Sequence, residues 1–284
     1  MNLLVIGEIM IKYSLSAKDG AELFLYLQEP AGTARGVLCL VHGLGDYSGC
    51  FTYLIDFFSK ASFAVMAIDL HGNGASSGTR GHISNIETLY DDVALLVEQA
   101  KEKYPSLPIF LYGHSLGGNL VLNYVIKRKP EISAAIASAP WIEVTEQPVL
   151  KRSLGYFLDS FVPNFIIDAG IDASKLSHDP VFVENYAKDP LVHGKISAHL
   201  LASSCRSGLW AVQHAGELNV PVLLMQGSSD FITSIKATQR LYDRAPKETT
   251  VFKIWNDDFH SLHNEINRED IFNFVLSFID PLSA

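Results

Sequence analysis

A serine, an aspartate and a histidine, far apart in this 284-residue chain, have the types and the order that nucleophilic catalysis requires. Ser115 is the central residue of the segment 113–117, which reads G-H-S-L-G and fits the motif G-x-S-x-G. A hydroxyl is a poor nucleophile near neutral pH, so it needs a base within hydrogen-bond reach and an acid that fixes the tautomer of that base. His260 and Asp230 can fill these roles, and the chain order Ser, Asp, His is the one expected on an α/β sheet.

Other residues compete for two of these roles. His263 lies three residues after His260 and is the rival base. Asp69 could also hold an imidazole, but it precedes the serine and is better explained as a residue that forms a turn. The two histidines could form a metal site, yet neither an H-E-x-x-H motif nor cysteine ligands accompany them. We therefore expect Ser115, Asp230 and His260 to act together, without a metal or a cofactor.

Two backbone N–H groups are needed as well, because the tetrahedral intermediate of acyl transfer carries a negative oxygen. One donor is expected from the residue after the nucleophile, Leu116. The second is expected from Leu44, in the loop after the buried strand Val37–Val41, where glycines on both sides let the chain bend toward the site. His42, in the same loop, is expected to hold the loop by a side-chain hydrogen bond rather than to act as a base.

The residues around the serine predict a turn between a buried strand and a helix. Ile109–Tyr112 is a short apolar run without helical phase, as in a buried parallel strand. A helix is expected from Leu116 to Arg128, stopped before Pro130, with its positive end toward the serine. Further strands are predicted at Gly36–Val41, Phe63–Ile68, Ala134–Ala139, Val220–Gln226 and Thr249–Trp255, and an antiparallel hairpin at Ile9–Leu15 and Glu22–Gln28.

The alternation of strands and helices stops after Trp141. From about 143 to 216 the pattern is one of short helical pieces separated by prolines, which indicates an inserted cap. The alternation elsewhere predicts an α/β fold with a mostly parallel sheet and helices on both faces. We therefore predict a first part of the core at 1–142, a helical cap at 143–216 and a second part of the core at 217–284.

One piece of the predicted cap, Leu150–Phe161, places apolar residues at helical spacing. The ordinary explanation is that this stripe packs on the main domain. The alternative is a lid helix whose apolar face touches an acyl chain or a lipid surface, and Leu154 and Phe157 would then contact the substrate.

Composition argues against several classes of partner. The chain has 31 acidic and 22 basic residues, a net charge of −9 and no block of Lys and Arg, so binding to nucleic acid is not expected. No apolar run reaches the roughly 18 residues of a membrane-spanning helix, so contact with a membrane would be peripheral, through the cap. Cys39, Cys50 and Cys205 are odd in number and widely spaced, which indicates reduced thiols and a cytoplasmic protein.

Several segments, spread over nearly the whole chain, match motifs of one enzyme group. They are HGLGD at 42–46, DLHGNGAS at 69–76, GHSLGG at 113–118, SAP at 138–140, GSSD at 227–230 and FHSLH at 259–263. Together they resemble the monoglyceride lipase and lysophospholipase-like α/β-hydrolases, also labelled serine aminopeptidase S33 or "hydrolase 4". The resemblance implies an α/β-hydrolase fold with a mobile helical cap over an acyl channel. It also implies Ser115, Asp230 and His260 as the catalytic triad, and Leu44 and Leu116 as the oxyanion donors.

The same resemblance implies residues that hold the leaving group. Monoglyceride lipases of this group look to use an acidic residue, an arginine and a histidine to bind the glycerol hydroxyls. Asp46 and His263 match the first and the third, but Cys50 stands where the arginine is expected. A thiol cannot supply the hydrogen-bond fork of a guanidinium, so this departure bears on selectivity for monoacylglycerol and not on ester hydrolysis.

We therefore predict a serine ester hydrolase that cleaves monoacylglycerols, lysophospholipids or short acyl esters through an acyl-enzyme intermediate. An acyltransferase or an amidase would use the same three residues and differ only in acceptor or leaving group. A catalytically silent hydrolase fold that binds an acyl ligand is the alternative outside enzymes. The complete set of catalytic elements argues against it.

Overall fold

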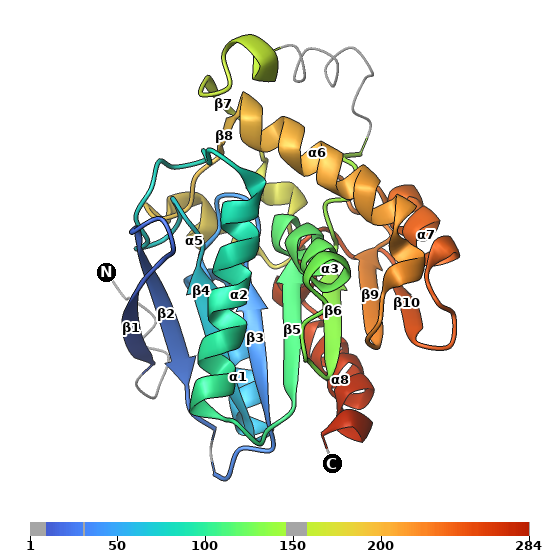
Figure 1. Cartoon of the computed structure of the whole chain (residues 1–284). Coiled ribbons are helices and arrows are strands. Elements are labelled where there is room, and N and C mark those ends of the chain that lie inside the picture. Colours follow the sequence, from blue (N-terminus) through green and yellow to red (C-terminus); the bar gives the residue numbers. More distant parts are fainter. Residues whose placement is uncertain (1–9, 31, 146–157, 284) are drawn as a thin grey trace.

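The computed structural model describes residues 10–30, 32–145 and 158–283, and every structural statement below refers to these residues. An eight-stranded sheet forms the centre of the fold, in the order β1-β2-β4-β3-β5-β6-β9-β10. Figure 1 shows this sheet with helices in front of it and behind it. Adjacent strands pair in parallel from β4 through β3, β5, β6 and β9 to β10, whereas β1 pairs antiparallel with β2, and β2 pairs antiparallel with β4. The predicted sheet, mostly parallel and covered on both faces, is confirmed.

The strands lie close to where the sequence places them. The predicted hairpin is formed by β1 (Ile11–Ser16) and β2 (Glu22–Gln28) at one edge of the sheet. Five central strands are buried along their whole length, as their continuous apolar runs predict. These strands are β3 (Gly36–Val41), β4 (Phe63–Asp69), β5 (Ile109–His114), β6 (Ala134–Ser138) and β9 (Val222–Gly227), and β10 (Thr250–Trp255) completes the other edge.

The helices cover the two faces and give the fold two apolar cores. Alternate residues of a strand point to opposite faces, and β3 shows this directly, since Cys39 belongs to one core and Leu40 to the other. One core lies under α2, α3, α6 and α7, and the other lies under α1 and α8. The helices are α1 (Thr52–Lys60), α2 (Ile86–Lys103), α3 (Leu116–Arg128), α6 (Ala198–Gln213), α7 (Ile235–Arg244) and α8 (Arg268–Ile279).

The chain between β6 and β9 includes the range 143–216, for which a cap is predicted. Its described part includes β7 (Ile166–Asp168), β8 (Lys195–Ser197) and α5 (Pro180–Lys188), and it continues into α6. In Figure 1, β7 and β8 lie at the top of the view, beyond the carboxyl ends of the parallel strands. The division into two core segments and a cap stays a prediction.

Helix α6 differs from the short pieces that the sequence predicts, because it runs for 16 residues. It packs against α3, and small side chains on its inner face allow the close approach. The helix also approaches the segment after β6 closely at Gly208, where a Cβ would lie 2.2 Å from the carbonyl oxygen of Ile142. Because these contacts are to a distant part of the chain, the helix gains its length from tertiary packing rather than from its own sequence.

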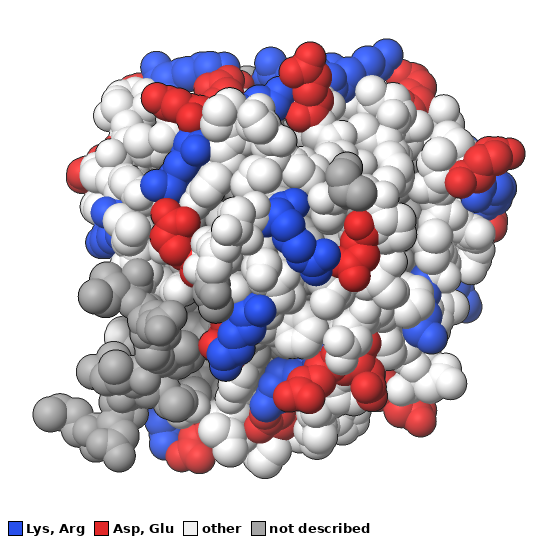
Figure 2. Space-filling model, turned by 90° about the horizontal axis from the view of Figure 1, so that it is seen from below, with Lys and Arg blue, Asp and Glu red and all other residues white. Residues whose placement is uncertain are grey.

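The surface opposite β7 and β8 carries charges of both signs. Figure 2 shows this surface from below the view of Figure 1, with basic and acidic side chains interspersed rather than gathered by sign. Exposed ion pairs such as Arg35 with Asp280 and Lys60 with Asp56, each at 2.8 Å, contribute little to stability.

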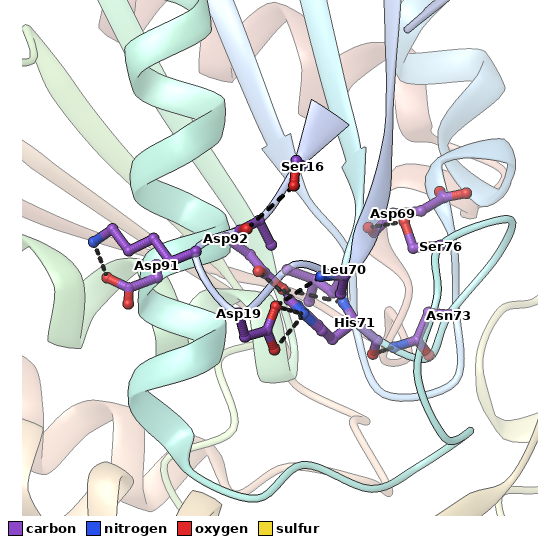
Figure 3. A network of polar contacts seen from close by, with 12 residues as sticks. Ser16, Asp19, Asp69, Leu70, His71, Asn73, Ser76, Asp91 and Asp92 are labelled. Atoms are coloured by element: carbon purple, nitrogen blue, oxygen red, sulfur yellow. Dashed lines mark hydrogen bonds and ion pairs between the residues drawn. The ribbon is translucent and has the colours of Figure 1, made fainter. Parts of the chain in front are cut away.

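A buried histidine joins three elements beside the carboxyl end of β4 (Figure 3). His71 lies in the loop after β4, and its Nδ1 is 2.7 Å from Oδ1 of Asp92 on α2. Its Nε2 is 3.2 Å from a carboxylate oxygen of Asp19, in the turn between β1 and β2. Burial alone would lower the pKa of His71, but the hydrogen bonds and charges of Asp92 and Asp19 raise it overall. His71 thus links the hairpin, the loop and the helix through its contacts with the two carboxylates.

Replacing His71 with asparagine is expected to lower the free energy of unfolding by about 2 kcal/mol at pH 6, because it removes charge-assisted hydrogen bonds to the buried Asp92. The pKa of His71 is higher in the folded than in the unfolded protein, so this contribution is present at low pH and is lost as the pH rises through the folded-state value. Urea unfolding of both proteins at several pH values measures the difference. A difference that does not shrink between about pH 6 and pH 9 would contradict the assignment.

Candidate active site

Ser115 occupies a strained turn between β5 and α3, as its motif predicts. Its backbone has φ 54° and ψ −115°, a conformation that residues with a side chain rarely adopt. A Cβ on Gly113 would lie 2.3 Å from the carbonyl oxygen of Gly117, and a Cβ on Gly117 would lie 2.1 Å from that of Val41. Both flanking positions therefore require glycine, and the turn presents the serine at the carboxyl end of the sheet.

Asp230 and His260 come from the loops after β9 and β10 and form a buried pair. Nδ1 of His260 is 2.9 Å from Oδ2 of Asp230, which fixes the orientation of the imidazole. The carboxylate also accepts hydrogen bonds from the hydroxyl of Thr233 at 2.7 Å and the amide of Gln226 at 3.1 Å. Burial alone would raise the pKa of Asp230, but the charge and the hydrogen bond of His260, together with the hydrogen bonds from Thr233, lower it overall. Asp230 therefore stays ionised opposite the imidazole.

Ser115 and His260 lie in the wall of one cavity of about 230 Å³. Both are nearly buried, with exposed fractions of 7% and 3%. Within the described residues no hydrogen bond joins the Ser115 hydroxyl to the His260 ring in this state. Catalytic hydrogen bonds of this kind are often long in the absence of substrate and tighten in the complex. The geometry therefore brings all three predicted residues to one place, with the acid and the base already paired.

The backbone amides of Leu44 and Leu116, whose role as oxyanion donors stays a prediction, belong to segments beside Ser115. Leu116 is the first residue of α3, so its N–H belongs to the free amino end of the helix, where the dipole is positive. Leu44 lines the cavity beside Ser115. Within the described part of the chain, neither the Leu44 nor the Leu116 amide donates a hydrogen bond to the protein. This is the state expected of an oxyanion hole before substrate binds.

The loop that carries Leu44 is held by His42, as predicted. Nε2 of His42 accepts a hydrogen bond from the backbone amide of Leu70 at 3.0 Å, so this ring nitrogen is not available as a base. The rival acid Asp69 also has a structural role. It accepts hydrogen bonds from the backbone of Ser48 and of Ala75, both at 2.9 Å, and thereby shapes the two loops beside β4.

Asp46 lines the cavity, and its carboxylate accepts a hydrogen bond from the hydroxyl of Tyr186 at 2.6 Å. The exposed fraction of Asp46 is only 8%, and this burial raises the pKa of its carboxyl, although Tyr186 opposes the shift. Tyr186 lies on α5, 140 residues away in sequence, and also lines the cavity. Asp46 thus lies in the cavity wall, and its role as a substrate-binding residue stays a prediction.

His263 lies close to His260 but does not belong to the residues that line the cavity. It is 1% exposed and stacks on Phe51 with ring centres 4.2 Å apart, and its other neighbour is His114 at 4.7 Å. Burial, and then the charge of His260, lower the pKa of His263 to about 3. A neutral, enclosed ring is suited to packing behind His260, and its role as a substrate-binding residue stays a prediction.

Leu154 and Phe157, predicted to touch the substrate, lie outside the described residues. The apolar wall that the structure does describe comes from other segments. Its members lie after β6, around β7 and after β9, and they are Trp141, Val144, Ile171, Leu176, Phe231 and Ile232.

Comparison with known proteins shows to which family this chain belongs. The family model described as serine aminopeptidase, S33, matches residues 32–267. The chain belongs to this family. It is 29% identical over 271 residues to the monoacylglycerol lipase of Mycolicibacterium smegmatis, and the match covers 94% of this chain and 96% of that protein. It is also 32% identical over 269 residues to an uncharacterized abhydrolase domain-containing protein of Dictyostelium discoideum, of whose length it covers 28%.

A solved structure supports the same assignment. The monoacylglycerol lipase of Paleococcus ferrophilus superposes with a TM-score of 0.80 at 30% identity, over 91% of this chain and 99% of that one. The predicted resemblance, the α/β-hydrolase fold and the prediction of a carboxylic ester hydrolase are confirmed by these matches.

Sequence reasoning missed three residues of this S33 site. Thr233 and Gln226 hold the Asp230 carboxylate, and Tyr186 holds Asp46. A signal existed for Thr233, because a hydroxyl residue three positions after an aspartate often closes a local turn. Gln226 was also visible as a polar residue that ends an otherwise apolar buried strand. Nothing local points to Tyr186.

Proposed function

We propose that this S33 family member hydrolyses esters of single acyl chains, such as monoacylglycerols, lysophospholipids or short acyl esters, with Ser115, Asp230 and His260 as its catalytic triad. The observation that carries the proposal is the buried His260–Asp230 pair at 2.9 Å, in the wall of the cavity that also holds the strained Ser115. Similarity to proteins named monoacylglycerol lipase supports the choice of substrate.

In the first half of the reaction, Ser115 attacks the carbonyl carbon of the ester while its hydroxyl proton passes to Nε2 of His260. Asp230 accepts a hydrogen bond from the Nδ1–H group of His260 and stabilises the imidazolium that forms. The amides of Leu44 and Leu116 bind the oxyanion. When the tetrahedral intermediate collapses, the ester C–O bond breaks, and the imidazolium returns its proton to the leaving alcohol.

In the second half, water repeats the chemistry on the acyl-enzyme. His260 takes a proton from water, the hydroxide equivalent attacks the acyl carbon, and the bond to the Ser115 oxygen breaks as it takes the proton back. The products are a carboxylic acid and the free enzyme. The apolar residues of the cavity wall suit the acyl chain, since each methylene removed from water contributes about 0.8 kcal/mol.

A fluorophosphonate probe tests the nucleophile, since it reacts with an activated serine and forms a stable covalent adduct. We expect the wild-type protein to be labelled at Ser115 and the Ser115→Ala variant to be unlabelled, as read by intact mass. Hydrolysis of a panel of monoacylglycerol, lysophosphatidylcholine, p-nitrophenyl esters and aminoacyl amides then tests the substrate class. A folded wild-type protein that resists the probe would overturn the triad, and a preference for the amides would overturn the ester substrate.

Peripheral contact with a lipid surface is part of the proposal. Among the described residues, none of the helices is long and apolar enough to cross a bilayer. Several large apolar side chains around β7, on α5 and beside the cavity are exposed, and they are Phe161, Val162, Phe165, Ile167, Val181 and Phe231. We expect a Phe165→Ser variant to sediment with phosphatidylcholine vesicles less than the wild type does. Equal sedimentation of both proteins would contradict a contact through this surface.

A further inference from the structure

The carboxylate of Asp46 lies beside the nucleophile, on the same side of the cavity as the oxyanion loop. Gly43 lies between the Asp46 carboxylate and the Ser115 side chain. The position that a Cβ of Gly43 would take is 2.8 Å from Oδ2 of Asp46 and 3.2 Å from Cβ of Ser115, so both residues border one small gap. A group attached a few bonds from the ester oxygen can therefore reach Asp46 while the carbonyl is at Ser115.

The surroundings of Asp46 are acidic. Cys50 lies four residues further along the chain, and the pKa of its thiol is raised by burial and then by the charges of Asp46, Asp189 and Asp69. Asp189 accepts a hydrogen bond from the hydroxyl of Tyr47 at 2.8 Å. In the described structure, neither Asp189 nor Asp69 forms an ion pair with a lysine or an arginine. The electrostatic potential at this end of the cavity is consequently negative.

Among the described residues that line the cavity there is neither a lysine nor an arginine to offset these charges. The nearby cations act elsewhere, since Arg80 donates to the carbonyl oxygens of Leu191 and Gly74, and Lys175 is exposed and lies over the ring of Phe231. Asp46 thus has Tyr186 as its side-chain hydrogen-bond partner, and the charges that act on it come from the histidines His42 and His260 rather than from a lysine or an arginine of the described residues.

We propose that the leaving-group side of the cavity selects a cationic alcohol, so that the preferred substrates are acyl esters of amino alcohols whose ammonium group binds Asp46. This inference rests on the proposed ester hydrolysis and adds the chemistry of the leaving group. A carboxylate removed from water binds an ammonium more strongly than a neutral group, because the hydrogen bond is charge-assisted and the local dielectric is low. The ammonium keeps its charge throughout the reaction, and the leaving oxygen takes its proton from His260.

Two esters of the same shape isolate the charge. 2-(Dimethylamino)ethyl butanoate is protonated near neutral pH, whereas 3-methylbutyl butanoate replaces its ammonium by a neutral carbon centre. We expect kcat/KM of the wild type to be about tenfold higher for the charged ester, from the difference between charged and neutral hydrogen bonds. The readout is the ratio of the two values divided by the ratio of the rates of the same two esters in hydroxide-catalysed hydrolysis, because this removes the electron-withdrawing effect of the ammonium and cancels changes in the amount of active enzyme.

Variants test whether Asp46 causes the preference for the charged ester. Asp46→Asn should reduce the ratio to about one, whereas Glu248→Gln should leave it unchanged, because Glu248 is exposed just before β10, at the end of the sheet away from the site. Cys50→Arg should also reduce the ratio by placing a cation beside Asp46, and it keeps the test decisive if Asp46→Asn does not fold. A wild-type ratio of one or less, in a protein that the fluorophosphonate labels, would overturn the inference alone. Absence of both labelling and hydrolysis would instead overturn the proposed function.

Discussion

Replacing His260 with alanine is expected to lower kcat for ester hydrolysis by about 10⁴-fold or more, because no other group can take the proton from Ser115. The imidazole is paired with Asp230 and lines the cavity with the serine, whereas His42 is engaged by the amide of Leu70. Much of the remaining rate would come from the oxyanion donors and from binding, which this substitution leaves in place. KM should therefore change far less than kcat.

The measurement is steady-state hydrolysis of p-nitrophenyl butanoate, with circular dichroism to show that the variant is folded. His263→Ala is the variant to compare with His260→Ala, since His263 is the rival base and lies only three positions away. His263 packs between Phe51 and His114, so its removal should affect the position of the His260 ring and cost much less than loss of the base itself. A larger loss of kcat in His263→Ala than in His260→Ala would reverse the assignment of the base.

Replacing Asp230 with asparagine is expected to lower kcat by about 10⁴-fold at neutral pH while the fold is retained. The carboxylate oxygen that faces Nδ1 of His260 would become part of an amide, which can present N–H to the ring and stabilise the wrong tautomer. The backbone amides of Ile232 and Thr233 donate to the other carboxylate oxygen, so they would hold the asparagine oxygen there and place its NH₂ group toward the ring. The lowered pKa of Asp230 means that the wild-type carboxylate stays charged well below neutral pH.

Rates of p-nitrophenyl butanoate hydrolysis over a range of pH measure this loss. Asp69→Asn tests the rival acid, and we expect it to reduce thermal stability more than turnover, since Asp69 holds the loops around Ser48 and Ala75. An Asp230→Asn enzyme that keeps turnover within tenfold of the wild type would show that another group orients the base.

The nucleophile could be predicted from sequence because every feature that defines it is local. The strand, the serine and the helix lie within twenty residues, from Ile109 to Arg128. The need for glycine at 113 and 117 follows from contacts between neighbouring turns of the same segment and the adjacent strand. Such short-range geometry depends little on the rest of the fold, so a motif of five residues is enough to indicate it.

The acid and the base could be predicted from topology, without any knowledge of distances. Parallel strands bring their carboxyl ends to one edge of a sheet, so residues just after β9 and β10 meet near the residue after β5. The order of strands in the sheet was not needed for this argument. The hydrogen bonds that tune Asp230, from Thr233 and Gln226, depend on side-chain positions within that edge and became visible only in the structure.

The amino-acid sequence by itself determined the α/β class and the strained serine turn, and it predicted the catalytic partners of the serine, because apolar periodicity, glycine spacing and strand ends are properties of short segments. Only the tertiary structure decided what surrounds them. It brought Tyr186 of α5 to Asp46, enclosed His263 against Phe51 and laid α6 on α3. Each of these contacts joins segments that are distant in the chain, and their energies come from packing and burial that no local pattern encodes.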